Sequence, residues 1–177
     1  MPAPEKTSLS KIVAAGRELL EEVGRQGLTM QNVAERVGVR APSLYKHVAN
    51  RAALLTAVAE ATVDDLRAQA EATDGSLEEL MRSYRRFAHA RPEGFRLMFD
   101  ASTEALARTT EPVLRASGRL AGEQHALEAA RTVTAWATGF INMELSGHFR
   151  LGGDVEQGFE YGLATICRAL GNGAGQG

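Results

Sequence analysis

The sequence predicts an all-α protein of about nine helices, and three observations support this fold class. Alanine and leucine are abundant among the 177 residues, β-branched residues are sparse and only five prolines occur, a balance that favours helix. Apolar residues recur at intervals of three and four along most of the chain, which is the period of a helix with one buried face. No segment shows the alternation of apolar and polar residues expected of a half-buried strand.

The first helix is expected over about residues 8–23, where apolar residues form one broad stripe. Ser8 or Ser10 could cap its amino end, because a short hydroxyl side chain accepts a hydrogen bond from an unpaired backbone amide. Gly24 and Gly27 should end it.

Two short helices should follow. Thr29 is a favoured N-cap for a helix over 30–37, and Gly38 comes directly after it, where a left-handed residue turns the chain sharply. Pro42 lies in the first turn of a third helix over 41–47, where its missing amide hydrogen costs nothing.

Longer helices should make up the rest of the chain. Asn50 can cap a fourth helix over about 51–72, Ser76 opens the next helix, and Pro92 ends it. A short apolar segment follows Pro92, and the last three helices are expected over 103–120, 123–149 and 155–170.

The second and third helices together have the properties of a helix-turn-helix, which needs two short helices joined by a sharp turn with small or apolar residues between them. Ala34 is small where the helices would cross, and Gly38 makes the turn. Val39 and Leu44 supply apolar anchors. Groups that bind base edges and phosphates then occupy the outer face of the third helix, namely Arg40, Ser43, Tyr45, Lys46 and His47. The spacing alone also fits a helical hairpin whose polar side chains are merely solvated.

Residues 28–55, LTMQNVAERVGVRAPSLYKHVANRAALL, resemble the DNA-binding domain of the TetR family of regulators. The family pattern Thr-x-x-x-Val-Ala, Gly-Val, Leu-Tyr-x-His and a following basic residue appears in order. The resemblance implies an all-helical homodimer in which three amino-terminal helices bind DNA, a fourth connects, and a variable carboxyl-terminal body binds a small effector. It also implies that effector binding shifts the fourth helix and spreads the two DNA-reading heads.

Carried over by position, the resemblance assigns contacts with bases or nearby phosphates to the starts of the second and third helices, and backbone contacts to the residues that follow. The residues expected to contact DNA are Gln31, Arg40, Ala41, Pro42, Ser43, Tyr45, Lys46, His47 and Arg51. Arg51 stands where the family usually has Lys; both bind phosphate, but Arg can do so with two donors. Val48 stands where many members have Phe.

The charge distribution is uneven along the chain. The formal net charge is −2, yet residues 1–55 carry eight basic and five acidic side chains, which is a net charge of +3. The remaining residues carry twelve basic and seventeen acidic side chains, a net charge of −5. A basic amino-terminal third on an acidic body is suited to presenting one end of the molecule to phosphates, although an excess of this size also arises by chance.

Several classes of protein find no support in the sequence. Phosphate-binding loops, nucleophile elbows and metal-ligand spacings do not occur, so we expect no enzymatic activity, no cofactor and no metal site. A single cysteine, Cys167, excludes an internal disulfide and is expected to be a buried small residue. The sequence has neither a signal peptide nor an apolar run of membrane-spanning length, so we expect a cytoplasmic protein.

We expect three parts in the chain: a helix-turn-helix domain over 1–55, an effector-binding and dimerisation domain over 56–171, and a disordered tail over 172–177. The second domain offers apolar residues that could line a pocket for a small hydrophobic molecule or form plain core: Met81, Tyr84, Phe87, Phe95, Phe99, Leu114, Trp136 and Phe140. Residues 136–144 resemble the penultimate helix of a common class of TetR-like ligand domains, in which the last two helices of each subunit form the dimer interface. The residues expected there, unless they belong to an intramolecular core, are Gly139, Gly147, Val155, Phe159, Gly162, Leu163 and Ile166.

The function expected from the sequence is that of a ligand-responsive transcriptional regulator. It would bind double-stranded operator DNA as a homodimer at a near-palindromic site, and a small hydrophobic effector would release it. Repression is the commoner outcome in the family, and the sequence does not separate it from activation. The alternative is an effector-independent structural DNA-binding protein on the same fold, associated with the nucleoid or with cell division.

Overall fold

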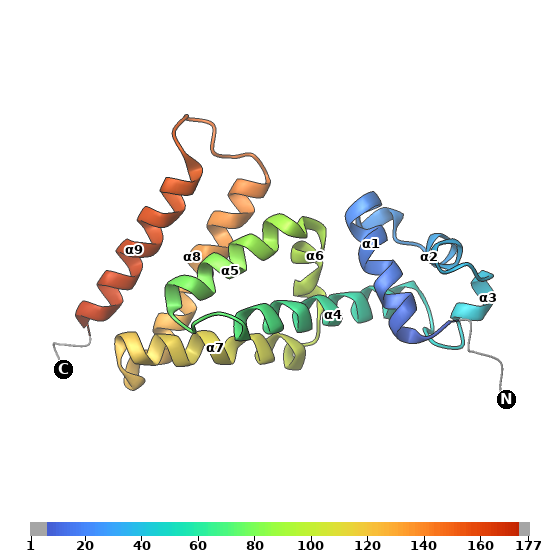
Figure 1. The fold of residues 1–177 in the computed structure, drawn as a ribbon, viewed down its shortest axis with the longest axis horizontal. Coiled ribbons are helices and arrows are strands. Elements are labelled where there is room, and N and C mark those ends of the chain that lie inside the picture. Colours follow the sequence, from blue (N-terminus) through green and yellow to red (C-terminus); the bar gives the residue numbers. More distant parts are fainter. Residues whose placement is uncertain (1–6, 174–177) are drawn as a thin grey trace. The chain divides into compact units, whose positions relative to one another are not determined.

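The computed structural model describes residues 7–173, which form nine α-helices and two short 3-10 helices without any strand (Figure 1). The predicted fold class is therefore confirmed. The elements are α1 (Leu9–Gly27), α2 (Met30–Val37), α3 (Ala41–Leu44), α4 (Arg51–Glu71), α5 (Leu77–Ala90), α6 (Pro92–Leu97), η1 (Met98–Asp100), α7 (Thr103–Ala121), η2 (Glu123–His125), α8 (Ala126–Leu145) and α9 (Val155–Gly173).

The chain divides into two units that are not contiguous in sequence. The amino-terminal unit takes the chain up to Asp65 and adds residues 91–106, so it holds α1 to α3, most of α4, α6 and η1. The carboxyl-terminal unit holds the end of α4 together with α5, most of α7, α8 and α9. Among residues 7–173, no helix combines the length and the hydropathy that a membrane-spanning segment requires.

Short polar side chains set where the helices of the amino-terminal unit begin. Ser8, Thr29 and Asn50 each accept a hydrogen bond from the backbone amide three residues later, at 3.4, 3.2 and 2.9 Å. These bonds satisfy amides that have no partner inside the helix. The predicted caps at Thr29 and Asn50 are confirmed, and of the two candidates for α1 the structure uses Ser8.

The predicted end of α1 at Gly24 appears as an interruption. Gly24 adopts a φ of 67° and a ψ of 176°, outside the helical region, after which the chain completes another turn to Gly27. A residue with a side chain would be strained at this φ, which explains the glycine.

The core of the amino-terminal unit is built by α1, α2 and α4 together with α6. Its side chains that are at most 1% exposed include Ile12, Leu20, Val33, Leu44, Leu54 and Phe95. Glu21 of α1 fixes α6, because its carboxylate accepts hydrogen bonds from the backbone amides of Glu93 at 3.1 Å and Gly94 at 2.8 Å. Arg25 adds an ion pair with Asp100 at 2.5 Å.

In the carboxyl-terminal unit, α5 packs against α8 and α9 (Figure 1). Trp136 of α8 stacks on Phe159 of α9, with ring centroids 5.2 Å apart. Gly162 makes this approach possible, because a Cβ atom there would lie 2.4 Å from the indole carbon Cζ2.

The carboxyl end departs from expectation. We expected the last helix to stop at Leu170, but α9 continues to Gly173. The remaining part of the predicted tail, residues 174–177, lies outside the described residues.

Candidate nucleic-acid interface

The turn between α2 and α3 follows the sequence expectation. Gly38 is left-handed, with φ 77° and ψ 32°, and its amide donates to the carbonyl of Glu35 at 3.1 Å. The next amide, that of Val39, donates to the carbonyl of Ala34 at 2.9 Å. These bonds satisfy carbonyl groups at the end of α2 and turn the chain directly into α3.

The third helix is shorter than predicted. It covers Ala41–Leu44 rather than residues 41–47, and the next three residues form a turn. The amides of His47 and Val48 both donate to the carbonyl of Leu44, at 2.8 and 2.9 Å, so the regular pattern of one amide per carbonyl ends there. Leu44 and Val48 are 0% and 4% exposed and anchor this turn in the core.

The residues expected to contact DNA lie on the surface around this turn. Five are exposed: Gln31, Arg40, Pro42, Tyr45 and Lys46. The other four are half-buried: Ala41, Ser43, His47 and Arg51. Gln31 is oriented by its neighbour one turn later, because its Nε2 donates to Oε1 of Glu35 at 2.7 Å.

The basic residues of this unit differ in whether a carboxylate neutralises them. Arg36 faces α1, where its guanidinium makes two hydrogen bonds of 3.0 and 2.5 Å to Glu22. This interaction raises the pKa of Arg36 and holds the pKa of Glu22 below its ordinary value. Within residues 7–173, neither Arg40 nor Lys46 has a carboxylate within 4.0 Å. Their positive charge is therefore available to an anionic partner.

Arg51 has partners that the sequence analysis did not foresee. Its Nε donates to the carbonyl of Leu28 at 2.7 Å, and its Nη2 donates to the carbonyl of Arg25 at 2.5 Å. Both acceptors are backbone atoms 23 and 26 residues away in sequence. No side-chain pattern indicates such bonds, so periodicity and spacing could not have found them.

The eight residues proposed for a pocket are distributed over both units. Phe95 and Phe99 lie in the amino-terminal unit, 5.8 Å apart and edge to face; Phe95 is fully buried and Phe99 is 49% exposed. The other six lie in the carboxyl-terminal unit. Met81, Tyr84 and Phe87 are buried there, and Leu114, Trp136 and Phe140 are half-buried.

Tyr84 is the one proposed pocket residue with an ionisable group. Its hydroxyl lies 3.1 Å from the hydroxyl of Thr138. Burial raises the pKa of Tyr84 to about 12, while the bond to Thr138 partly opposes that rise. The phenol therefore stays neutral at physiological pH and acts through hydrogen bonding.

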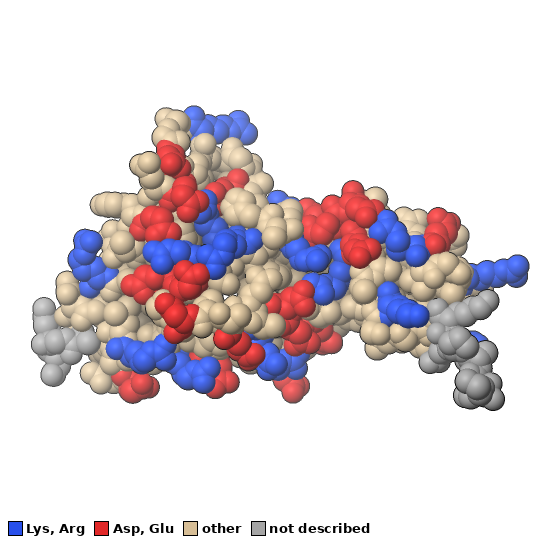
Figure 2. Space-filling view, in the orientation of Figure 1, with Lys and Arg blue, Asp and Glu red and all other residues tan. Residues whose placement is uncertain are grey.

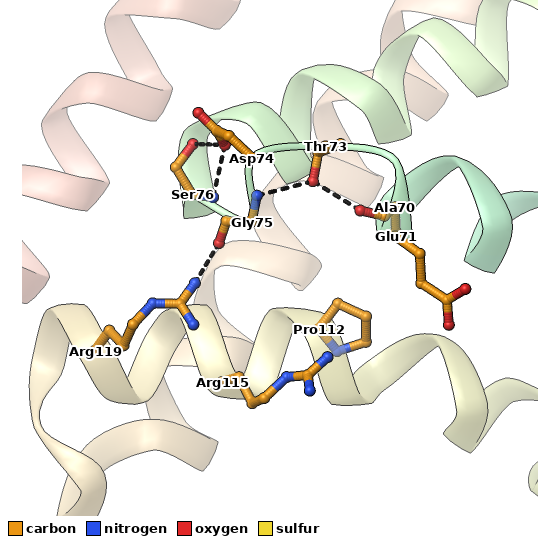
Figure 3. A pocket seen from close by; sticks show the side chains of 9 residues that line it. All are labelled: Ala70, Glu71, Thr73, Asp74, Gly75, Ser76, Pro112, Arg115 and Arg119. Atoms are coloured by element: carbon orange, nitrogen blue, oxygen red, sulfur yellow. Dashed lines mark hydrogen bonds between the residues drawn. The ribbon is translucent and has the colours of Figure 1, made fainter.

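Two surface hollows of the carboxyl-terminal unit are lined by other residues. The larger, of about 580 Å³, is lined by Ala70, Glu71, Thr73, Asp74, Gly75, Ser76, Pro112, Arg115 and Arg119 (Figure 3). Arg119 extends from α7 to donate to the carbonyl of Gly75, and Oδ1 of Asp74 accepts from the amide of Ser76 at 2.8 Å. The second, of about 470 Å³, is lined by Arg82, Arg85, Arg86, His89, Glu156 and Phe159. Both hollows carry several charged side chains, in contrast to the apolar pocket expected from the sequence.

On the face that Figure 2 shows, positively and negatively charged side chains are interspersed over the carboxyl-terminal unit. Arg85 of α5 makes two hydrogen bonds to Glu144, of 2.9 and 2.6 Å, pairs with Glu156, and lies 4.9 Å from the ring centre of Phe159. Arg82 makes a similar pair of bonds to Glu160, of 2.9 and 2.7 Å. These contacts tie α5 to α8 and α9 and neutralise the charges involved.

The residues expected at a dimer interface fall into two groups. Phe159 and Leu163 are fully buried within a single chain, and Gly162 lies against Trp136, so these three form part of the core. Gly139 and Gly147 are exposed; Val155 and Ile166 are half-buried.

Cys167 is 4% exposed, as expected for a buried small residue. Burial, with a further contribution from Glu78, raises the pKa of the Cys167 thiol to about 12. Among residues 7–173 no group of three or more His, Cys, Asp or Glu side chains is placed to hold a metal ion.

Comparison with known proteins places both parts of the chain. Residues 12–58 match the sequence model described as bacterial regulatory proteins, tetR family, and residues 77–166 match the one described as tetracyclin repressor-like, C-terminal domain. The chain is 34% identical over 166 residues to the tetracycline repressor protein class A from transposon 1721 of Escherichia coli, covering 86% of this chain and 75% of that protein.

Solved structures show the same architecture. A TetR Q116A variant from Acinetobacter baumannii AYE, solved in complex with minocycline, has a TM-score of 0.68 and 29% identity, covering 90% of this chain and 93% of that one. ActR from Streptomyces coelicolor, in its apo form, has a TM-score of 0.73 over 98% of this chain and 99% of that one, and its 20% identity supports the fold alone.

Proposed function

The chain belongs to the TetR family of DNA-binding transcriptional regulators, and from this premise we propose that it is a repressor released from a near-palindromic operator by a small effector. The observation that carries the proposal is the exposed surface around the α2–α3 turn. There Arg40 and Lys46 lack neutralising partners among the described residues, beside a turn that Gly38 makes sharp.

We assign the reading of the operator to that surface. Gln31 and the residues from Arg40 to Ser43 would approach base edges. There Arg recognises guanine and Gln recognises adenine through paired hydrogen bonds. Tyr45 and His47 would bind the phosphate backbone, and Lys46 would contact either. A protein acting on operator DNA works where the chromosome lies, so we propose the cytoplasm as its location.

We propose that the active form is a homodimer joined through the exposed sides of α8 and α9. Leu127 and Met143 of α8 are 44% and 47% exposed, and Tyr161 of α9 is 77% exposed. Small residues separate them, and nothing lies within 4 Å of the position that a Cβ atom would take at Gly139. Apolar side chains among small residues allow two helices to approach closely, as a helix-packing interface requires.

The effector proposed is a small, largely hydrophobic molecule bound in the carboxyl-terminal unit. Support comes from the apolar and aromatic side chains of α5 and α8, with Tyr84 and Thr138 as the nearby polar pair. A relative with similar architecture was solved in complex with minocycline. Similarity to tetracycline repressor proteins over most of the chain favours this function over that of an effector-independent structural DNA-binding protein.

Two experiments test the proposal. Duplexes selected from a random-sequence library should share a near-palindrome with half-sites one or more helical turns apart, and sedimentation should give one protein dimer per duplex. Enrichment of no common sequence, or binding as a monomer, would contradict it. A thermal-shift screen of small hydrophobic compounds should then find one that raises the unfolding temperature and lowers affinity for the selected duplex, because a ligand that binds only the folded state stabilises it.

A further inference from the structure

Arg51, the first residue of α4, is half-buried, and its side chain is turned toward the connection between α1 and α2. Its Nε and Nη2 donate to the carbonyls of Leu28 and Arg25, at 2.7 and 2.5 Å. Arg25 lies two residues before Gly27, the last residue of α1, and Leu28 is the C-cap directly after it.

The chemistry of this position favours a guanidinium group. The last carbonyls of a helix lack partners within the helix and carry partial negative charge, so a cation that donates hydrogen bonds there is stabilising. A third carbonyl of the same segment, that of Gly27, accepts from Nδ2 of Asn32 in α2 at 2.8 Å. Side chains from α2 and from α4 thus both bind the end of α1.

The apolar contacts beneath this segment place it firmly on α4. Leu28 and Leu54 are fully buried. A Cβ atom added at Gly16 of α1 would lie 3.6 Å from Leu54 and 3.7 Å from Leu28, so both leucines pack at the same point of α1. Arg51 adds directional hydrogen bonds to this packing, directly before the first helix of the helix-turn-helix.

We propose that Arg51 is a positioning residue that joins the first turn of α4 to the α1–α2 connection and so sets the orientation of the DNA-reading surface, instead of contacting phosphate. This inference rests on the proposed function. Two of the three nitrogens of the guanidinium are already engaged, which fixes its plane. The fork geometry of Arg can serve two separate carbonyls, whereas the single ammonium of Lys has no such planar pair of donors.

The test compares Arg51→Ala and Arg51→Lys with the wild-type protein, and uses Lys46→Ala as the control that removes an exposed, unneutralised ammonium. Affinity is measured over a series of salt concentrations for two probes: a duplex that the wild-type protein selected from a random library, and an unselected duplex of equal length. Urea unfolding of each variant reports how much of the protein is folded under the assay conditions.

A positioning role predicts that Arg51→Ala loses about tenfold in affinity for the selected duplex, on the scale of a lost charged hydrogen bond, with little change on the unselected duplex. The salt dependence on the unselected duplex should stay that of the wild type, while Lys46→Ala reduces its slope by about 0.9. Arg51→Lys should recover only part of the lost affinity, although it keeps the charge.

Two results would overturn the inference. If Arg51 contacts phosphate, Arg51→Ala would reduce the slope of the salt dependence by about 0.9 on both duplexes, and Arg51→Lys would restore the wild-type slope fully. A purely structural role would lower the free energy of unfolding and leave both affinities of the folded variant unchanged. If the wild-type protein selects no duplex at all, the proposed function fails and this inference fails with it. Results on the Arg51 variants test only the inference, so the two failures can be told apart.

Discussion

At the scale of single residues, Arg40 combines exposure with a charge that no carboxylate among residues 7–173 neutralises. Arg36, four residues earlier in the chain, has the same side chain but directs it to Glu22 and Glu18 of α1. Two arginines of one short segment are thereby suited to different tasks, one to an external partner and one to holding α2 on α1.

We expect Arg40→Ala to relax the preference for particular bases by about 1–3 kcal/mol, the range of one bidentate base contact. Competition between the selected duplex and its single-base variants measures the effect. Arg36→Ala is the matched control, since it removes an equal charge without altering base preference. Equal losses for Arg40→Ala on selected and random DNA would assign Arg40 to the phosphate backbone.

Gly162 has no side chain where the indole of Trp136 needs the space. Gly162→Ala would place a methyl group 2.4 Å from an indole carbon, and overpacking of this kind should lower the free energy of unfolding by about 1–3 kcal/mol. Gly158→Ala, four residues earlier in α9, meets only Phe140 at 3.7 Å and should instead stabilise by about 0.5–1 kcal/mol. Urea denaturation measures both; equal effects would refute the packing argument.

Features that depend on neighbouring residues were predictable from the sequence, and features that depend on distant ones were not. The caps at Thr29 and Asn50 and the left-handed Gly38 follow from the residue itself and its position beside a helix. The bonds of Arg51 involve backbone oxygens 23 and 26 residues away, which no local pattern encodes.

At the scale of elements, α6 is packed on α1 although 64 residues separate Gly27 from Pro92 along the chain. The carboxylate of Glu21 supplies the N-terminal cap that α6 lacks in its own sequence, since its N-cap Arg91 makes no such bond. Nothing in the apolar spacing of residues 91–106 indicates this placement, because the cap comes from a residue of another helix.

Removal of that cap should loosen α6. We expect Glu21→Ala to lower the free energy of unfolding by about 1–2 kcal/mol, the usual cost of losing a charged cap. The amides of Glu93 and Gly94 should also exchange their hydrogens with solvent faster than in the wild type. Glu18→Ala, one turn earlier on the same helix, removes only an exposed ion pair and should change stability by less than about 0.5 kcal/mol. Unchanged exchange in Glu21→Ala would contradict the role of the cap.

The contacts of Arg85 make the stability of the packing between α5, α8 and α9 depend on pH. Hydrogen bonds from Arg85, and to a lesser extent from His89, hold the pKa of Glu144 below its ordinary value of 4.5. A carboxyl group whose pKa is lowered on folding stabilises the folded protein at every pH above its pKa in the unfolded chain. That stabilisation is lost as the pH falls through the pKa that the group has in the folded protein.

Stability should therefore decline in acid less steeply for Glu144→Gln than for the wild type. Free energies of unfolding measured from pH 7 down through and below pH 4.5 check this prediction. Glu128→Gln, exposed on the same helix, serves as the control and should keep the wild-type slope. Parallel curves for the wild type and Glu144→Gln would show that the pair with Arg85 contributes nothing to folding.

At the scale of the whole molecule, the apolar stripe of α9 was expected to serve either a partner subunit or the core. The structure buries Phe159 and Leu163 of that stripe within one chain, and the ring of Phe159 packs against Trp136 and Phe140. The partner subunit that we propose would therefore have to bind the opposite, exposed sides of α8 and α9. Periodicity identified which residues share a helix face but could not say which face meets its own chain.

Dimerisation through this face predicts that Tyr161→Glu, which puts a charge among small and apolar residues, shifts the protein from dimer to monomer at micromolar concentration. Operator affinity should fall together with dimerisation, because one reading head makes half of the contacts. Sedimentation measures the first effect and duplex binding the second. Gln69→Glu on α4 adds the same charge at an exposed position elsewhere and should leave the dimer intact.

The number of helices and several of their boundaries could be predicted, because an apolar period bounded by Gly, Pro or a cap marks most of the long helices. The helix expected over 123–149 is shorter, since a 3-10 turn over Glu123–His125 precedes α8 and α8 ends at Leu145. The short α3 was overestimated, since two successive amides share the carbonyl of Leu44 in a turn that periodicity does not distinguish from helix. The division into two units, with residues 91–106 joined to the amino-terminal helices, follows only from the tertiary contacts.

The burial of Cys167 has a practical consequence for studying the regulator in motion. The chain contains one cysteine, and its thiol is both shielded from solvent and protonated at neutral pH, with a pKa of about 12. Maleimide dyes react with exposed thiolates, so the native protein already serves as a nearly silent background for labelling. A cysteine introduced at an exposed helix position would carry a fluorophore selectively. Energy transfer between the two subunits of the proposed dimer would then report whether a candidate effector changes the distance between their DNA-reading surfaces.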